Sequence, residues 1–525
     1  MQLPSLPKPR LLTTAVAGLS ATLLAATAVS SAVPAAAQSK PLVIAYAGSP
    51  RNLNPWLAYD NVSDTMILNV YDQLVTYATV KQNGQTVGTW DKFKPMLAKR
   101  WTSNKAKTVW TFYLRKAEFS NGDPVTAQDV VWSYKTGDTP AGLQFLLQEA
   151  AFKSIKALNS STVQITLSHP SPMLFGILAM YPESILDPKV VKAHGQAWLA
   201  NHMVGSGPYE MQSYNPSTQA VFVPNPHYWG PKPAISEIVL KFVPNPSVRQ
   251  ELVMTGAAGL TVELSPEQLK TMAGNPAIVE HTNPTETVWF VNLNEKDPPF
   301  NNQLVRQALS YAVPYKTLIS QVMEGYATPM NSAVPVGMPY HTGAGFDYTY
   351  DPAKAKALLK KAGFAKGFTF TLAVDPSEAG TVEDATLIQS AFQKIGVTVK
   401  IQQMANAQYL NAQNNKTLDA SFEGWESFVN DPGYHLGFLL YGPSTENASN
   451  FNNPKVNQML QKAEFDPNTS QRRSLYLEVQ KIINQEAPWL DLYQTENVDV
   501  TSRNLEGYIF YPDMLLRFPP FHFAG

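Results

Sequence analysis

The chain has 525 residues, of which 44% are hydrophobic and 15% charged, a composition typical of a globular protein and not of a disordered one. Its 40 basic and 41 acidic residues leave a net charge of -1, which excludes the strongly basic surface of a nucleic-acid-binding protein. The chain has no cysteine, so disulfides, thiolate metal sites, iron–sulfur clusters and a lipid-modified N-terminal cysteine are excluded.

Residues 1–37 have the pattern of a secretory signal peptide. Lys8 and Arg10 form a short basic start, residues 11–33 are uncharged and apolar or small, and three alanines stand just before Gln38. A retained membrane anchor is the alternative, because the apolar stretch is long enough to span a bilayer. We expect cleavage before Gln38 and a mature protein in the periplasm that is neither membrane-spanning nor a lipoprotein.

The remaining chain predicts a mixed α/β fold. Alternating or apolar runs predict strands, and apolar residues three or four apart predict helices. In chain order we expect strand 42–47, a helix from 65 that breaks towards a strand at 75, strand 108–115, helix 126–134, strands 162–167 and 235–242, helices 304–312 and 352–362, strand 368–374, helix 383–395, strand 397–402 and helix 471–485.

Local signals support several of these elements. Asp129 stands three residues after Thr126, the spacing of a capping box. Asp351 precedes a helix that ends at Gly363, a residue suited to a helix C-cap. The strand–helix–strand order of residues 368–402 predicts a right-handed βαβ unit.

Motifs of known enzyme classes are absent from the sequence. There is no G-x-S-x-G elbow, no H-E-x-x-H helix and no phosphate-binding G-x-x-x-x-G-K-[ST] loop. The nearest pair of histidines, His194 and His202, is too far apart to share one helical face as metal ligands. We therefore expect no catalytic residue, no cofactor and no metal site.

Several stretches, in order, resemble the periplasmic solute-binding proteins of the peptide/nickel/opine class, which serve ABC importers. The most specific is FSNGDPVTAQDV at residues 119–130. The others are LNP at 53–55, VYDQLV at 70–75, MLAKRW at 96–101, WTFYLR at 110–115, GSGPY at 205–209, NPHYW at 225–229, VRQALSYA at 305–312 and DPAKA at 351–355. The resemblance extends over nearly all of residues 40–520.

This resemblance implies a two-lobe α/β fold with an extra inserted domain and a hinge between the lobes. Lobe I would comprise residues 38–76, 205–292 and 496–525, the inserted domain 77–204, and lobe II 293–495. Crossings near 291–294 and 493–498 would form the hinge, and closure would bury a ligand between the lobes. The glycines at 205 and 207 then belong to a tight turn and not to a phosphate-binding nest.

The implied function is capture of a peptide, peptide-like or opine-like small solute and its delivery to an ABC transporter permease in the inner membrane. We expect a monomer that catalyses no reaction. Two alternatives come from other classes of protein. One is a secreted hydrolase acting on a peptide or glycoside, and the other is a periplasmic chaperone-like protein that binds extended chains.

The resemblance also implies a ligand-facing segment at residues 424–434. Its candidate ligand-binding residues are Trp425, Phe428 and Asp431. Dipeptide-binding members carry an aspartate at the position of Phe428, which pairs with the ligand's amino group, and an aromatic ring is only a weak substitute. Trp425 could instead belong to the core, and Asp431 to a turn before Pro432.

Four further residues complete the expected ligand site, and two other segments lack the charges of known relatives. The four residues are Tyr59, Asp60, Asn61 and Phe145. Residues 373–386 have no basic side chain where dipeptide-binding members often have arginine, and residues 180–186 have none where nickel-chelate-binding members use one. The expected pocket is aromatic and polar, suited to a longer peptide, an opine-like conjugate or a sugar-containing solute stacked on Trp425.

The signal-peptide hypothesis makes the first prediction. Because the three alanines before Gln38 are the only well-placed cleavage site, Edman sequencing of the exported protein should begin at Gln38. A mature chain that begins at Met1, or one that fractionates with membranes, would contradict cleavage and favour the retained anchor.

Overall fold

A computed structural model of the protein describes residues 40–82, 84–137, 145–296, 298–427, 429–464, 466 and 468–525. Over these residues the fold is mixed α/β, as the sequence predicts. No helix among them is both long enough and apolar enough to cross a bilayer. The expected signal peptide and its cleavage site lie outside the described residues.

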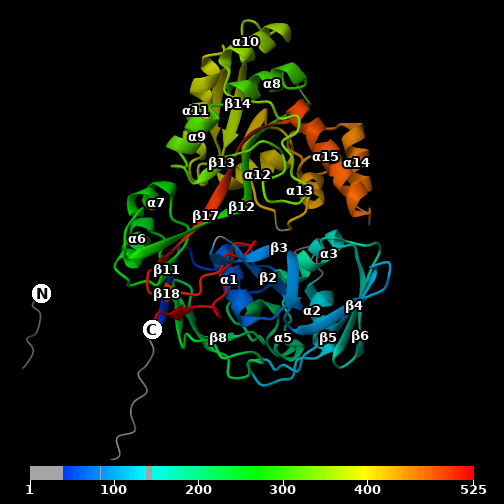
Figure 1. The fold of residues 1–525 in the computed structure, drawn as a ribbon, viewed down its shortest axis with the longest axis vertical. Helices are drawn as coiled ribbons and strands as arrows, with labels where there is room; N and C mark the ends of the chain where they lie inside the picture. The colour runs from blue at the N-terminus through cyan, green and yellow to red at the C-terminus, as the bar shows by residue number, and fades with distance from the viewer. Residues whose placement is uncertain are drawn as a thin grey trace, which may run out of the picture. The chain divides into compact units, whose positions relative to one another are not determined.

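One large sheet runs through both lobes. Its strands are β1 (Leu42–Tyr46), β8 (Tyr209–Asn215), β9 (Gln219–Pro224), β10 (Ile238–Phe242), β11 (Leu260–Thr261), β12 (Ile278–Leu293), β13 (Ala327–Pro329), β14 (Thr369–Val374), β15 (Thr398–Gln403), β16 (Ala420–Trp425) and β17 (Trp489–Ser502). The order is β15-β14-β16-β12-β17-β11-β1-β10-β9-β8, and β13 pairs with β17. Lobe I is built on the strands from β11 to β8, and lobe II on β14, β15 and β16 (Figure 1).

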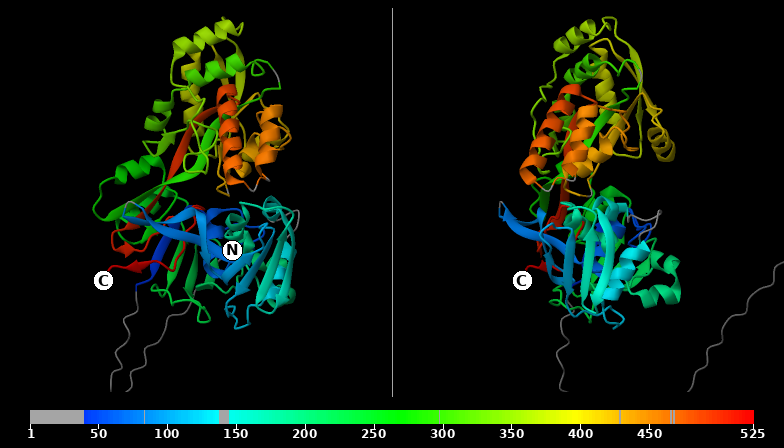
Figure 2. Two further views of the ribbon diagram at one scale, coloured as in Figure 1. Left: turned by 45° about the vertical axis from the view of Figure 1, so that its right-hand side comes forward. Right: turned by 90° about the vertical axis from the view of Figure 1, so that its right-hand side faces the viewer.

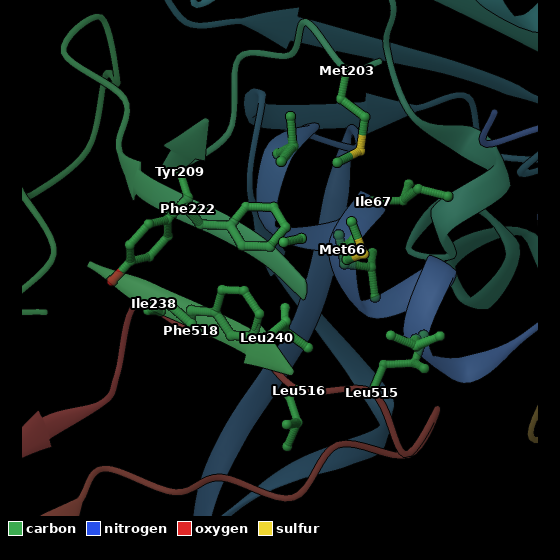
Figure 3. Packing of buried hydrophobic residues seen from close by; sticks show 14 of the residues in the cluster. Met66, Ile67, Met203, Tyr209, Phe222, Ile238, Leu240, Leu515, Leu516 and Phe518 are labelled. Atoms are coloured by element: carbon green, nitrogen blue, oxygen red, sulfur yellow. The ribbon is translucent and has the colours of Figure 1, made fainter. Parts of the chain in front are cut away.

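Lobe I packs its core between the sheet, one buried helix and the end of the chain. Its other elements are α1 (Asn61–Val70), α6 (Pro246–Met254), α7 (Pro266–Met272), β18 (Leu505–Glu506) and β19 (His522–Phe523). Met66 and Ile67 of α1 belong to the same apolar cluster as Phe222, Leu240 and Phe518 (Figure 3). Burial of these side chains holds α1 in place, so the residues at its N-terminus have a defined position.

The inserted domain contains a hairpin and a separate antiparallel sheet. The hairpin joins β2 (Val75–Gln82) to β3 (Gln85–Pro95), and the sheet has the order β4 (Ala98–Ser103), β5 (Val109–Leu114), β7 (Thr162–Leu167), β6 (Phe152–Asn159). Its helices are α2 (Ala127–Gly137), α3 (Phe145–Glu149), α4 (Leu174–Leu178), α5 (Pro188–His194) and the short 3-10 helices η1 (Tyr181–Glu183) and η2 (Gln196–Ala200). One apolar cluster joins its strands with α2, α3 and α4, whereas η1, α5 and η2 contribute Tyr181, Val191 and Leu199 to the apolar cluster of lobe I.

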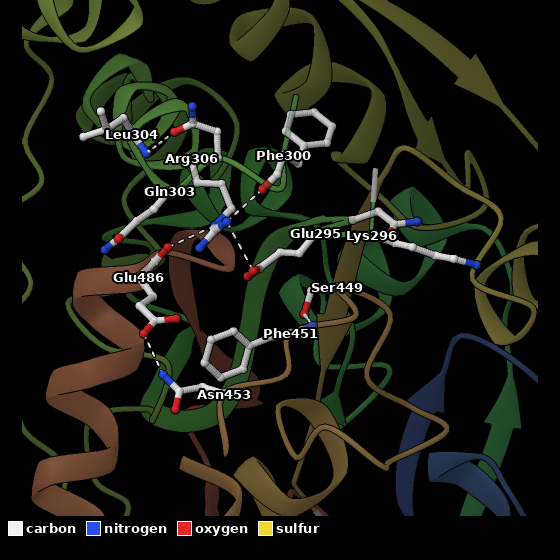
Figure 4. Close-up of polar contacts among 12 residues, drawn as sticks. Glu295, Lys296, Phe300, Gln303, Leu304, Arg306, Ser449, Phe451, Asn453 and Glu486 are labelled. Atoms are coloured by element: carbon white, nitrogen blue, oxygen red, sulfur yellow. Dashed lines mark hydrogen bonds and ion pairs between the residues drawn. The ribbon is translucent and has the colours of Figure 1, made fainter. Parts of the chain in front are cut away.

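Lobe II surrounds the parallel strands β15, β14 and β16 with helices. Its helices are α8 (Gln303–Ala312), α9 (Tyr315–Gln321), α10 (Pro352–Lys361), α11 (Thr381–Gln393), α12 (Asn406–Asn414), α13 (Pro432–Leu439), α14 (Pro454–Glu464) and α15 (Thr469–Glu486). Strands β14 and β15 are parallel neighbours with α11 between them in the chain, which confirms the predicted βαβ unit. Buried Arg306 of α8 joins the start of the lobe to α15, because it contacts Glu295 at 3.2 Å and donates to the backbone oxygens of Phe300 and Glu486 (Figure 4).

Strands β12 and β17 carry the chain between the lobes as one antiparallel pair, seen from two directions in Figure 2. From Ile278 to Pro284, β12 pairs with the part of β17 that also contacts β11; from Val288 onwards it pairs with β16 as well. The register shifts between Pro284 and Val288 and again between Trp289 and Phe290. Both shifts lie before the crossing expected at 291–294, where β12 still pairs with β16.

Most predicted elements are present, with bounds that differ by a few residues. Helix α1 starts four residues before the expected Thr65, because the Asp60 carboxylate caps it by accepting a hydrogen bond from the Ser63 amide at 2.8 Å. Thr126 donates to the Asp129 carboxylate, as the capping signal predicts. Strand β10 begins at Ile238, three residues after the expected start. The long strands β12 and β17 were not predicted as continuous elements.

The glycine-containing turn at 205–208 packs directly on the end of α1. A Cβ atom on Gly205 would lie 2.0 Å from the Val70 carbonyl oxygen, and the Gly207 amide donates to that oxygen at 2.8 Å. The Ser206 hydroxyl donates to the buried Asp72 carboxylate at 2.9 Å. The turn therefore needs glycine for close backbone approach and holds α1 against the inserted domain.

This contact gives the second prediction. Gly205→Ala should lower the free energy of unfolding by about 1–3 kcal/mol or more, because the new methyl group overlaps backbone that cannot move aside. Gly48→Ala is the matched control, since a Cβ atom there would meet nothing within 4 Å. Chemical denaturation followed by circular dichroism measures both changes, and equal stabilities of the two variants would contradict the packing argument.

Candidate functional site

A pocket between the lobes brings together residues that are far apart in the sequence. It is lined by Tyr59, Asp60, Asn61, Asp64, Tyr181, Gly424, Trp425 and Glu426 and has a volume of about 260 Å³. We call it the acidic pocket. Four residues expected to bind ligand from the sequence, Tyr59, Asp60, Asn61 and Trp425, therefore lie around one cavity.

Local structure positions the lobe I side of the acidic pocket. Asp60 is the N-cap of α1, and its carboxylate also accepts the Ser63 hydroxyl at 2.7 Å and the Arg51 amide at 3.1 Å. The helix N-terminus attracts negative charge, so this carboxylate has a structural role. Tyr59 directly precedes the cap and is 66% exposed, which leaves most of its ring accessible to a ligand.

Asp64 lies one helical turn after Asp60 and is only 6% exposed. Its Oδ1 has no hydrogen-bond partner among the described residues. Burial and, to a smaller extent, the charge of Asp60 raise the pKa of this carboxyl to about 9, although a hydrogen bond involving Tyr181 opposes the shift. Asp64 therefore holds a proton at neutral pH in the absence of a compensating positive charge.

Glu426 faces Asp64 from lobe II, where it follows strand β16. Its side chain reaches solvent inside the cleft, but the surrounding protein removes enough water to raise the pKa of the carboxyl to about 7. The charge of Glu426 also contributes to the raised pKa values of Tyr59 and Asp64. Carboxylates from the two lobes thus lie close together at the acidic pocket.

Trp425 ends β16 and combines packing with access to the cavity. Its half-buried ring lies 6.1 Å from the ring of Phe438, centroid to centroid, and borders the apolar clusters of both the inserted domain and lobe II. The indole Nε1 is buried and has no hydrogen-bond partner among the described residues. The structure thus supports both roles considered from the sequence: the ring packs against the core, and the residue lines the acidic pocket.

Asp431 has partners within the protein. Its carboxylate accepts the Gly433 amide at the start of α13 and binds the Arg472 guanidinium at 2.6 and 2.8 Å. This buried pair links α13 to α15 and fixes the ligand-facing segment. The charge of Asp431 is therefore compensated by Arg472, although the residue does line a neighbouring pocket.

The last two expected residues do not enter the description of the acidic pocket. Phe145 is the first residue of α3, and Phe428 lies outside the described residues. Asp64, Tyr181 and Glu426 line the acidic pocket but were not among the expected ligand-binding residues. A signal for two of them is present in the sequence, because Asp64 is one helical turn from Asp60 and Glu426 follows Trp425.

Three more pockets continue along residues 424–438. They have volumes of about 170, 590 and 510 Å³. Val429 of this segment belongs to the apolar cluster of the inserted domain, so lobe II contacts that domain here. Together the four pockets form what we call the interlobe cleft. Over the described residues, no group of three or more acidic or histidine side chains is arranged to hold a metal ion.

The fold and the cleft define a two-lobed solute-binding protein. Residues 92–447 match the family model of the bacterial extracellular solute-binding proteins, family 5, described as its middle region. The chain therefore belongs to this family. This confirms the resemblance inferred from the ordered sequence stretches.

Individual relatives match over almost the whole chain. DdpA of Escherichia coli (strain K12), named a probable D,D-dipeptide-binding periplasmic protein, is 28% identical, with 90% of this chain and 92% of the relative covered. The dipeptide-binding protein of the same strain is 27% identical, with 91% and 94% covered. The periplasmic binding protein DppA from Helicobacter pylori, associated with an ABC transporter and solved with the peptide STSA, has a TM-score of 0.77 and 27% identity, covering 92% of this chain and 98% of that one.

The position of Trp425 gives the third prediction. Trp425→Ala should weaken binding of a solute that occupies the acidic pocket by about 2 kcal/mol or more, the scale of a buried aromatic contact. Trp425→Phe separates the two roles of the side chain, because it keeps a ring but removes the indole N–H. Calorimetry measures both variants. Unchanged affinity of Trp425→Ala, at an unchanged melting temperature, would assign the residue to the core alone.

Proposed function

We propose that this protein is the extracellular receptor of an ABC importer, which captures a peptide or peptide-like solute between its lobes and presents it to a membrane permease. The observation that carries the proposal is the acidic pocket, whose walls come from α1 and η1 on one side and from the end of β16 on the other. A cavity shared by two lobes binds its ligand best when the lobes are closed.

The relatives support the solute class. Their names and titles refer to dipeptides, to glutathione and to a bound four-residue peptide. The interlobe cleft offers aromatic and polar groups to such a ligand along residues 424–438. We extend the proposal to a monomer that acts in the periplasm after removal of its signal peptide.

The other two classes of function are not favoured. A hydrolase needs reacting groups held around one substrate position, whereas the relatives that match over the whole chain are binding proteins. A chaperone-like protein that binds extended chains needs an open groove, whereas the acidic pocket here is a small cavity between two lobes.

Native mass spectrometry of protein purified without denaturation tests the solute class. The expected spectrum shows a complex of one protein chain and one small solute, and fragmentation of the solute yields amino-acid residues. A solute of another chemical class, such as a saccharide, would contradict the peptide assignment and leave the receptor assignment intact. Hydrolysis of supplied peptides by the purified protein would contradict both.

Motion about the β12–β17 pair gives the fourth prediction. Because both crossings between the lobes belong to one hydrogen-bonded pair with a register break between Pro284 and Val288, we expect closure by bending at that break. Small-angle scattering should give a smaller radius of gyration for protein saturated with a bound solute than for protein without it. Identical curves would contradict closure.

A further inference from the structure

The interlobe cleft is lined by more acidic than basic side chains. The acidic side chains that line its four pockets are Asp60, Asp64, Asp91, Glu149, Glu426, Asp431 and Glu464. Arg472 is the only basic side chain lining these pockets, as far as the structure describes the chain, and both oxygens of Asp431 already bind it. A carboxylate on a solute would therefore find no uncompensated cation in this cleft.

Asp64 shows where a positive group would be most favourable. The residue is more than nine-tenths buried, lines the acidic pocket and leaves Oδ1 without a hydrogen-bond partner in the described structure. Leaving a buried carboxylate oxygen unpaired is costly, and an N–H donor from a bound solute would remove that cost. Its neighbour Asp60, by contrast, already accepts three hydrogen bonds from within the protein.

Glu426 provides the opposing wall of the same cavity. Among the described residues, neither it nor Asp64 has a basic partner within ion-pair distance. Loss of water and nearby negative charges raise the pKa of both carboxyls, to about 9 for Asp64, where Asp60 and Glu426 contribute, and to about 7 for Glu426, where Asp513 contributes. Without a bound cation, the two carboxyls therefore tend to bind protons, and a bound cation would instead favour their charged forms.

The other lining residues also suit a cation. Tyr59, Tyr181 and Trp425 surround the two carboxylates, and aromatic rings attract ammonium and guanidinium groups in partly desolvated sites. With a volume of about 260 Å³, the acidic pocket has room for one such group with a short part of its chain, while the rest of the solute would follow residues 424–438 into the neighbouring pockets.

We propose that the acidic pocket binds an ammonium or guanidinium group of the solute between Asp64 of lobe I and Glu426 of lobe II, and that the protein selects cationic solutes whose carboxyl group it does not recognise. The inference rests on the proposed receptor function and specifies its ligand. A cation held by one carboxylate from each lobe also favours closure, since it gains its second partner only when the lobes meet.

Calorimetry with probes that differ in charge tests this selection. The probes are Ala-Ala-Ala, its C-terminal amide, N-acetyl-Ala-Ala-Ala, the N-acetylated amide and 1,4-diaminobutane. Acetylation of the amino group should weaken peptide binding roughly tenfold or more, because it removes the charge that Asp64 and Glu426 bind. Amidation of the carboxyl group should leave binding equal or tighter, because the described residues of the cleft include no uncompensated basic side chain.

Two variants connect the effect to the acidic pocket. Asp64→Asn and Glu426→Gln should each weaken binding of the free-amine amide roughly tenfold and remove most of the effect of acetylation. Glu267→Gln is the matched control, since it removes the same charge from an exposed position on α7 and should change nothing. Glu426 is accessible to solvent, so its variant should keep the melting temperature and remain informative if Asp64→Asn unfolds.

The outcomes separate this inference from the proposed function. If acetylated peptides bind as tightly as free ones, or if amidation abolishes binding, cation selection is wrong and the peptide receptor stands. If 1,4-diaminobutane binds in a Glu426-dependent manner and no peptide does, cation selection is supported and the peptide class is wrong. A protein that binds none of the five probes contradicts cation selection as stated.

Discussion

The antiparallel pairing of β12 with β17 is the constraint on which the rest of the protein depends. These two strands belong to both lobes, so each half of their ladder is the base on which one lobe is built. Two hydrogen-bonded crossings resist sliding and twisting better than one flexible linker would. The register break between Pro284 and Val288 interrupts the ladder at the level of the interlobe cleft.

Glu286 lies inside this break and adds a buried acidic side chain close to Asp431 and Glu426. It is 2% exposed, and both of its carboxylate oxygens lack hydrogen-bond partners among the described residues. Burial raises its pKa well above the ordinary value, and the charges of Asp431 and Glu426 raise it further. The crossing strands and the ligand-facing segment therefore share one acidic environment, in which each added negative charge makes the next less favourable.

The Asp431–Arg472 pair has the opposite character. It is buried, hydrogen-bonded through both carboxylate oxygens and neutral as a unit, and it ties the start of α13 to α15. Because this pair fixes the segment from within lobe II, Trp425 and Glu426 are presented on a supported surface and not on a free loop. Rigid support of this kind lowers the entropy lost when a ligand binds.

The sequence by itself determined the features that depend on neighbours in the chain. Strand and helix patterns and the capping signals at Asp129 and Asp351 predicted the α/β class, and the ordered stretches that resemble the family implied the two-lobe fold and the binding role. Only the tertiary structure decided that β12 and β17 pair, that Asp431 is neutralised by Arg472, and that Asp64 and Glu426 share one cavity. The reason is physical: capping and periodicity act over a few residues, whereas pairing, burial and pKa depend on groups that only folding brings together.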